Sequence, residues 1–188
     1  MSECEYWNPS DCVGTSECPP RCPRFIDKHG RALSIRGYQV KDRTALEAMY
    51  RSYGTAHRAQ GLPPITDRRI EEWLDHLIEN GDNVVASSDD RIVGHAVYIS
   101  GTGEPELAVF VHPDDHDKGI GTECCKQAIA RAAAAGHESL YLSVERTNRR
   151  AVAVYKRLGF ETVEAKGSEM RMRLVLSAPA AQELRLVQ

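Results

Sequence analysis

Apolar residues recur along the chain at two spacings, and the wider of the two predicts helices. Repeats of three to four residues predict one helix over residues 42–53 and another over residues 67–80. Asp42 and Thr66 carry side-chain oxygens that suit an N-cap, and Gly81 is placed to end the second helix.

Short apolar or alternating stretches predict strands between these helices and after them. They cover residues 33–38, 83–87, 92–100, 106–111, 140–144 and 170–176. The second and third form a hairpin through Ser88-Asp89-Asp90-Arg91. Because strands precede and follow helices without strict repetition, the pattern predicts an α/β fold around one mixed sheet, with no internal repeat.

The chain divides into three parts by composition. Residues 1–30 form a leader rich in cysteine and proline, in which Pro9, Pro19, Pro20 and Pro23 interrupt any regular element. We expect the folded domain over residues 31–178 and a short tail over residues 179–188.

The cysteines of the leader allow more than one interpretation. Cys18-Pro-Pro-Arg-Cys22 has a spacing that suits two zinc ligands, and Cys4, Cys12 or His29 would complete a set of four. The gap from Cys4 to Cys12 is not a standard ligand spacing, however. Free thiols in a reducing compartment are therefore preferred to structural zinc, and zinc to disulfides, so no metal site is predicted.

Composition and charge narrow the range of functions. Of the 188 residues, 41% are hydrophobic and 27% are charged, which is ordinary for a globular protein. A formal net charge of −3 argues against nucleic-acid binding as the main function. The N-terminus resembles no secretory signal, and the sequence contains no run of apolar residues long enough to cross a membrane. We therefore expect a cytoplasmic protein, without a nucleic-acid or membrane partner.

The stretch from Val109 to Gly121 carries the first chemical signal. An apolar strand ends at Pro113, a polar loop follows, and Gly119 and Gly121 then flank one apolar residue at the start of a helical pattern. Cys124 and Cys125 lie in that pattern and are expected to be small core residues. Unpaired N–H groups at such a turn attract an anion, and glycine lets it come close. The alternative is a tight strand-to-helix turn without a ligand.

The second signal is a helix from Asn148 to Gly159. Asn148 stands at the N-cap position and Gly159 at the C′ position. Tyr155 shares one face with Ala151 and Leu158. Taken alone, these residues indicate an ordinary cap and a core aromatic residue.

Together the two motifs resemble the GCN5-related N-acetyltransferase (GNAT) family. The resemblance rests on Val111-x-Pro113, His116-x-x-Gly119-Ile-Gly121 and Asn148-x-x-Ala151-x-x-x-Tyr155-x-x-x-Gly159-Phe160, and it extends from about residue 33 to 176. It implies a mainly antiparallel sheet in which two central strands splay apart. The family usually has Gln or Arg where this chain has His116. Phosphate binding in the family rests mainly on backbone amides, so we expect it to be retained.

The resemblance also implies how acetyl-CoA is bound. Its pyrophosphate would lie over the amides of the loop and first helical turn, and its pantetheine arm would pair with the strand edge and with Asn148. Tyr155 would lie near the sulfur. The predicted cofactor-binding residues are Val109, Phe110, Val111, His116, Asp117, Lys118, Gly119, Ile120, Gly121, Thr122, Asn148 and Tyr155.

Acetyl transfer to an amine needs a base, a donor for the oxyanion and an acid for the departing sulfur. Glu106, at the start of the strand, is the candidate base and would need burial to raise its pKa; the alternative is a solvated glutamate. Tyr155 is the candidate acid, and the amide of Val111 or its neighbour is the oxyanion donor. His95, His112 and His116 are held in reserve.

The resulting hypothesis is transfer of an acetyl group from acetyl-CoA to a primary amine of a small molecule or a protein by direct attack. The expected partner is therefore an amine acceptor, and a homodimer is compatible with the sequence. The alternative is a non-catalytic acyl-CoA sensor whose leader binds zinc or another protein.

Overall fold

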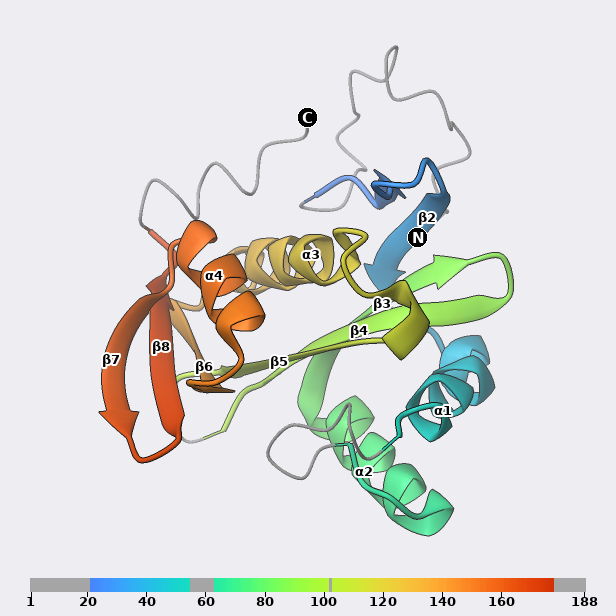
Figure 1. Cartoon of the computed structure of the whole chain (residues 1–188), viewed down its shortest axis with the longest axis horizontal. Coiled ribbons are helices and arrows are strands. Elements are labelled where there is room, and N and C mark those ends of the chain that lie inside the picture. The colour runs from blue at the N-terminus through green and yellow to red at the C-terminus, as the bar shows by residue number, and fades with distance from the viewer. Residues whose placement is uncertain (1–20, 55–62, 102, 178–188) are drawn as a thin grey trace.

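A computed structural model describes residues 21–54, 63–101 and 103–177, which form a sheet with helices on both faces (Figure 1). The strands are β1 (Arg24–Ile26), β2 (Ala32–Gly37), β3 (Gly81–Ser88), β4 (Arg91–Ile99), β5 (Glu106–Val111), β6 (Ser139–Glu145), β7 (Glu161–Lys166) and β8 (Glu169–Val175). The helices are α1 (Arg43–Arg51), α2 (Asp67–Asn80), α3 (Ile120–Ala134) and α4 (Arg149–Arg157), with 3₁₀ turns η2 (Val40–Asp42) and η4 (Pro113–Asp115). None of these helices is long and apolar enough to cross a membrane.

The sheet is mixed and mainly antiparallel, as predicted. Its strand order is β1-β2-β3-β4-β5-β6-β8-β7, and every neighbouring pair is antiparallel except β5 and β6. Figure 1 shows α3 and α4 on one face of the sheet and α1 and α2 on the other. Each helix pair closes its own cluster of buried apolar side chains against the sheet.

The central strands β5 and β6 diverge after a single residue pair. Glu106 and Tyr141 are the only residues in register between them, and the Tyr141 N–H donates to the Pro105 carbonyl at 3.0 Å. On their outer sides both strands remain paired along their length, β5 with β4 and β6 with β8. The predicted splay between two central strands is therefore confirmed.

Most predicted elements lie within two residues of their expected bounds. The six predicted strands correspond to β2, β3, β4, β5, β6 and β8. The β3–β4 hairpin turns at Asp89, whose φ of 52° is in the left-handed region. Cys124 and Cys125 are both buried in the core under α3, as expected.

Two strands were not predicted. Residues 24–26 form β1 and pair with β2, so the expectation that no regular element occurs before residue 31 is wrong for them. β7 escaped prediction because all six of its side chains are exposed, so it shows no alternation of apolar and polar residues.

The ends of the first two helices differ from the prediction in mechanism. The Asp42 carboxylate does not cap α1 but accepts hydrogen bonds from the Arg36 guanidinium at 2.7 and 3.0 Å and from the Gln39 N–H. Gly81 is extended and begins β3. A Cβ atom there would lie 2.5 Å from Val97 Cγ2, so close packing rather than a left-handed turn requires this glycine.

A buried polar chain ties α1 to the sheet. Tyr50 Oη lies 2.5 Å from His95 Nδ1, and His95 Nε2 lies 3.0 Å from Asn83 Oδ1. The Asn83 amide nitrogen donates to the carbonyls of Leu77 and Gly81, so Oδ1 must be the acceptor of the pair. His95 Nε2 therefore carries the proton, and Nδ1 accepts from the Tyr50 hydroxyl. Burial lowers the pKa of His95 to about 3.

This chain predicts a pH dependence of stability. Folded His95 has a pKa of about 3 and an unfolded histidine one near 6.5, so its contribution is complete above pH 6.5 and is lost as the pH falls toward 3. When the pH is lowered from about 7.5 to about 5, titration of His95 should reduce the free energy of unfolding by about 2 kcal/mol. Urea unfolding of the wild type and of His95→Gln at both pH values isolates this effect, because the variant lacks the titrating group. Equal losses in the two proteins would contradict it.

Candidate active site

The splay leaves one edge of β5 open. The His112 N–H donates to the Val93 carbonyl, and alternate residues of an antiparallel strand face the same neighbour. Phe110 therefore directs its backbone groups to β4, whereas Val109 and Val111 direct theirs into the gap between β5 and β6. The side chain of Phe110 packs on the α1–α2 side.

The far end of this edge is partly closed. The Val111 carbonyl accepts hydrogen bonds from the Tyr53 hydroxyl and from His116 Nε2, the latter at 3.0 Å. His116 therefore contacts the strand through this hydrogen bond. The N–H of Val111 and both backbone groups of Val109 remain directed into the gap, and these three groups are suited to pair with a chain of amides.

The start of α3 supplies the second set of backbone groups. Gly119 has a φ of 90°, which favours glycine, and its carbonyl accepts the first helical hydrogen bond, from the Glu123 N–H. Among the hydrogen bonds of the described residues, none is donated by an N–H group of Lys118, Gly119, Ile120, Gly121 or Thr122. A Cβ atom at Gly121 would lie 3.1 Å from Val111 Cγ2, so this glycine also lets α3 approach β5. The turn is therefore both tightly packed and open to an anion.

Side chains far away in the sequence hold this turn in place. Asp115 Oδ1 accepts from Lys118 Nζ at 2.8 Å and from Arg31 Nη2 at 2.7 Å, and Arg31 Nε also contacts the buried Asp27. The Lys28 N–H donates to the Lys118 carbonyl at 3.2 Å. Burial tends to raise the pKa of Asp115, but the hydrogen bonds from Lys118 and Arg31 outweigh it and lower that pKa. The β1–β2 hairpin therefore braces the glycine turn.

Asp117 joins the same loop to α4. Its carboxylate lies 3.1 Å from Arg150 Nη2, and its φ of 64° is left-handed. Both side chains are exposed, so the pair contributes little stability. It nevertheless spans the two elements that carry the predicted cofactor contacts.

The two predicted residues of α4 lie as the motif suggests. Asn148 Oδ1 accepts from the Ala151 N–H at 3.1 Å, which confirms the N-cap and leaves the amide nitrogen as a donor. The ring of Tyr155 packs 5.9 Å from that of Phe160 on the α3–α4 side. Burial, and to a lesser extent the neighbouring Cys125, raises the pKa of Tyr155 well above its usual value. Its hydroxyl is therefore a proton-bearing donor throughout the physiological range.

Glu106 has the solvated environment that was the alternative to burial. It is exposed, and its Oε2 accepts from the Tyr141 hydroxyl at 3.0 Å. Ala108 and Phe110, on the same side of β5, pack toward α1 and α2, so Glu106 faces that side of the sheet and Tyr155 the other. The two candidate catalytic residues thus flank the gap from opposite faces. The burial that sequence analysis required of Glu106 is absent.

The reserve histidines have structural partners. His95 lies in the buried chain described above, and His112 Nδ1 accepts from the Asp114 N–H at 3.2 Å. Burial lowers the pKa of His112. Among the described residues no group of three or more His, Cys, Asp or Glu side chains is arranged to hold a metal. Cys4, Cys12 and Cys18 lie outside those residues, and Cys22 is a free thiol.

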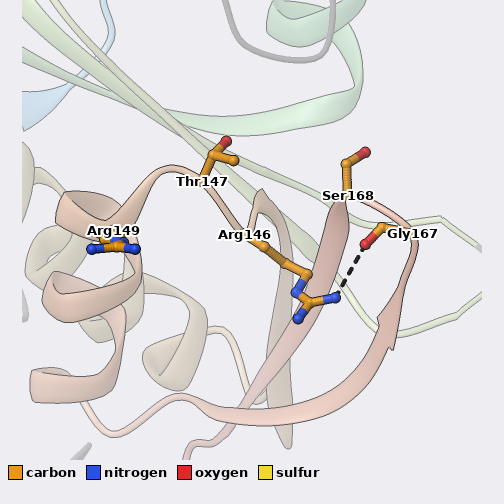
Figure 2. Close-up of a pocket in the computed structure, with 5 residues that line it drawn as sticks. All are labelled: Arg146, Thr147, Arg149, Gly167 and Ser168. Atoms are coloured by element: carbon orange, nitrogen blue, oxygen red, sulfur yellow. Dashed lines mark hydrogen bonds between the residues drawn. The ribbon is translucent and has the colours of Figure 1, made fainter.

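A separate hollow lies where β6 leads into α4, beside the β7–β8 turn. It encloses about 560 Å³ and is lined by Arg146, Thr147, Arg149, Gly167 and Ser168. Figure 2 shows Arg146 reaching the Gly167 carbonyl, at 3.3 Å, while Arg149 lies apart from that pair, on the helix. None of the predicted catalytic residues lines it.

Sequence reasoning missed Tyr53, Tyr141, Arg31 and Asp115. Tyr53 and Arg31 contact residues 58 and 84 positions away, and such pairings carry no local signal. Tyr141 follows from strand register alone, because it stands opposite Glu106. Its role was therefore accessible only with the strand order in hand.

Comparison with known proteins agrees with this arrangement. The sequence profile of the acetyltransferase (GNAT) family matches residues 46–160, more than half of the chain. An L-methionine sulfoximine/L-methionine sulfone acetyltransferase of Pseudomonas paraeruginosa is 28% identical over 139 residues, covering 69% of this chain and 81% of that protein. A mycothiol acetyltransferase of Saccharopolyspora erythraea is 28% identical over 68% of this chain and 43% of its own length.

Solved structures share the fold. The GNAT domain of S. lividans PAT superposes with a TM-score of 0.71 at 15% identity, covering 81% of this chain and 96% of that domain. A putative acetyltransferase of Salmonella typhimurium, solved with its cofactor acetyl-CoA, superposes with a TM-score of 0.61 at 22% identity, covering 78% of this chain and 95% of its own.

The bracing of the glycine turn predicts a selective loss of CoA affinity. Arg31→Gln removes a charge-assisted hydrogen bond from Asp115 and should raise the CoA dissociation constant about tenfold, or 1.4 kcal/mol, because the turn's amides lose their fixed positions. Turnover at saturating acetyl-CoA should change much less. Calorimetric titration with CoA measures the first effect and steady-state kinetics the second.

Arg36→Gln is the matched control. Arg36 lies on β2, the strand that follows Arg31, and pairs with Asp42, away from α3's first turn. It should lower stability without changing CoA affinity. Equal CoA affinity in both variants would show that the Arg31 network serves stability alone.

Proposed function

Because the chain belongs to the acetyltransferase (GNAT) family and is an acetyl-CoA-dependent N-acetyltransferase, we propose that it acetylates the primary amine of a small molecule by direct attack within the β5–β6 gap. The amine nitrogen would attack the thioester carbonyl carbon, and the carbon–sulfur bond would then break. The products would be the N-acetylated amine and CoA.

The open strand edge carries this proposal. The backbone groups of Val109 and Val111 have no strand partner, because β6 has left β5 after Glu106 and Tyr141. An amide-rich pantetheine arm would satisfy them as an added strand does. Its pyrophosphate would then reach the free amides of Gly119 to Thr122, where the helix dipole favours negative charge.

We propose Glu106 as the proton acceptor for the attacking amine. Its carboxylate lies at the end of the gap where β5 and β6 are still paired, on the face of the sheet opposite Tyr155. The ammonium form of the amine has no lone pair, so it would first lose one proton through Glu106 to solvent. The neutral nitrogen would then attack, and its second proton would leave by the same route as the carbon–sulfur bond breaks. The bond from Tyr141 holds the carboxylate at the gap.

We propose that Tyr155 donates a hydrogen bond to the departing sulfur. A phenol with a raised pKa is a weaker acid than a thiol of pKa near 8.5. Complete proton transfer to the thiolate would therefore be uphill. A hydrogen bond from the intact Tyr155 hydroxyl would stabilise the negative charge that develops on the sulfur. The raised pKa of Tyr155 suits this role, because the hydroxyl keeps its proton.

The named relatives support a small molecule as the acceptor. One is named for L-methionine sulfoximine and L-methionine sulfone and another for mycothiol. We keep the cytoplasm as the proposed compartment, where a reducing potential suits the free thiols of Cys22, Cys124 and Cys125. The sensor alternative predicts acetyl-CoA binding without turnover, so a single assay separates the two.

Tyr155→Phe tests the role of the hydroxyl. The variant keeps the ring that packs on Phe160, so stability should hold, while turnover should fall about tenfold or more with a smaller change in acetyl-CoA affinity. Release of free CoA thiol with a panel of amines measures turnover. Tyr98→Phe is the control, since Tyr98 is a buried tyrosine on β4 outside the gap. Parallel losses of binding and turnover would make Tyr155 a positioning residue, and a wild type that binds but never turns over would establish the sensor.

A further inference from the structure

The face of the sheet beyond α1 and α2 carries a pair of opposite charges beside the gap. Glu106 and Tyr141 are in register, so their side chains share this face, and the Tyr141 hydroxyl donates to Glu106. Arg171 stands on β8 opposite Ser143, diagonal to Tyr141. Its guanidinium carbon lies 3.9 Å from the centroid of the Tyr141 ring. One tyrosine therefore touches an exposed carboxylate at its hydroxyl and an exposed guanidinium on its ring.

The guanidinium of Arg171 has no acidic partner within 4.0 Å among the described residues. Glu164 lies opposite it on β7, yet the side chain stacks on Tyr141 instead, toward the gap. Arg173, two residues after Arg171 on β8, does have an acidic partner. It forms an ion pair with Glu104, whose carboxylate also accepts a hydrogen bond from the Ser139 hydroxyl. Of these two neighbouring arginines, Arg173 is paired with Glu104 and Arg171 is available to bind an anion.

The apolar part of the surroundings lies on the other side of Glu106. Ala108 and Phe110 follow it on the same face of β5, and the ring of Trp73 packs edge-on to that of Phe110, at 5.3 Å. A molecule held at Glu106 thus has a cation on one side and, further along the same face of β5, the aromatic pair of Phe110 and Trp73.

We propose that the acceptor is a free α-amino acid, whose carboxylate is bound by Arg171 and whose amine is presented by Glu106 to the thioester. The proposal rests on the proposed function, because it assigns the second substrate of the same gap. In an α-amino acid one carbon separates the amine from the carboxylate, and a hydrogen bond at each end spans about 2.8 Å. Such a molecule matches two charges separated by a single tyrosine side chain.

The chemistry of each group fits its role. A guanidinium presents parallel N–H donors to both oxygens of a carboxylate, and stacking on Tyr141 fixes its plane. The amine becomes nucleophilic only after losing a proton, so it must lie at the carboxylate that takes the proton. The side chain of the amino acid then extends toward Phe110 and Trp73, which favours apolar side chains.

The experiment compares glycine and each L-amino acid of proteins that carries a primary α-amine with its own amide, in which the carboxylate is replaced by a neutral group. We expect the wild type to acetylate at least one acid with a kcat/KM at least tenfold above that of its amide, an effect carried mainly by KM. Arg171→Gln should bring that ratio close to one, because kcat/KM should fall for the amino acid and stay unchanged for its amide. Arg171→Lys should retain part of it, because charge remains while the planar fork is lost.

Arg173→Gln is the matched control, since Arg173 lies on the same strand and is paired with Glu104. It should leave the acid-to-amide ratio unchanged. Acids and amides used equally well by the wild type, or a ratio that survives in Arg171→Gln, would overturn the amino-acid assignment while leaving the acetyltransferase intact. No turnover with any acid or amide, while other primary amines are acetylated, would overturn the amino-acid assignment alone. Acetyl-CoA binding without turnover on any amine would overturn the assignment and the proposed function together.

Discussion

The gap between β5 and β6 exists because two parallel strands share one residue pair and then part. Backbone N–H and C=O groups are strong hydrogen-bonding groups, and leaving them without partners inside a protein is costly. Here the cost is confined to the inner edges, since β4 and β8 satisfy the outer ones. Glu106 and Tyr141 set the point of divergence, and everything that we assign to the site is placed relative to that pair.

The surrounding elements stabilise the gap without filling it. Tyr53 and His116 donate hydrogen bonds to the Val111 carbonyl, and the absence of a side chain at Gly121 lets α3 pack against Val111. The buried chain from Tyr50 through His95 to Asn83 holds α1 against β4, and Tyr53 lies three residues further on, just after the end of that helix. Within the described part of the chain, the backbone groups of Val109 and the N–H groups at the start of α3 remain without hydrogen-bond partners. An amide-bearing arm would pair with the first and a pyrophosphate with the second. Ordered polar contacts therefore define the empty space as much as apolar packing does.

Local chemistry explains what could be predicted from the sequence. Gly119, Asn148 and Gly159 occupy positions whose backbone geometry or capping bond demands those residues, so their elements were predictable. The family resemblance added the splay and the cofactor. β7 could not be predicted, because its side chains are all exposed and its sequence shows no alternation. The sequence left both a buried and a solvated Glu106 open, since burial depends on what covers a strand end, and the structure shows the solvated one.

The pairing of distant residues was a second limit. Arg31 meets Asp115 across 84 positions, and Arg171 meets Tyr141 only through the β6–β8 register. No periodicity encodes either contact. Both contacts depend on how the chain is folded. The first braces the glycine turn and the second places a cation beside the gap, and neither feature is contained in the motifs.

Amide hydrogen exchange, read residue by residue by NMR with and without acetyl-CoA, tests the central claim most directly. If the cofactor pairs with the open edge of β5, the amides of Val109 and Val111 should become protected together with those of Ile120, Gly121 and Thr122. The amides of Phe110 and His112 face β4 and provide an internal control, so their exchange should change little. Protection on Phe110 and His112 without protection on Val109, or a bound cofactor that protects none of these groups, would contradict the account.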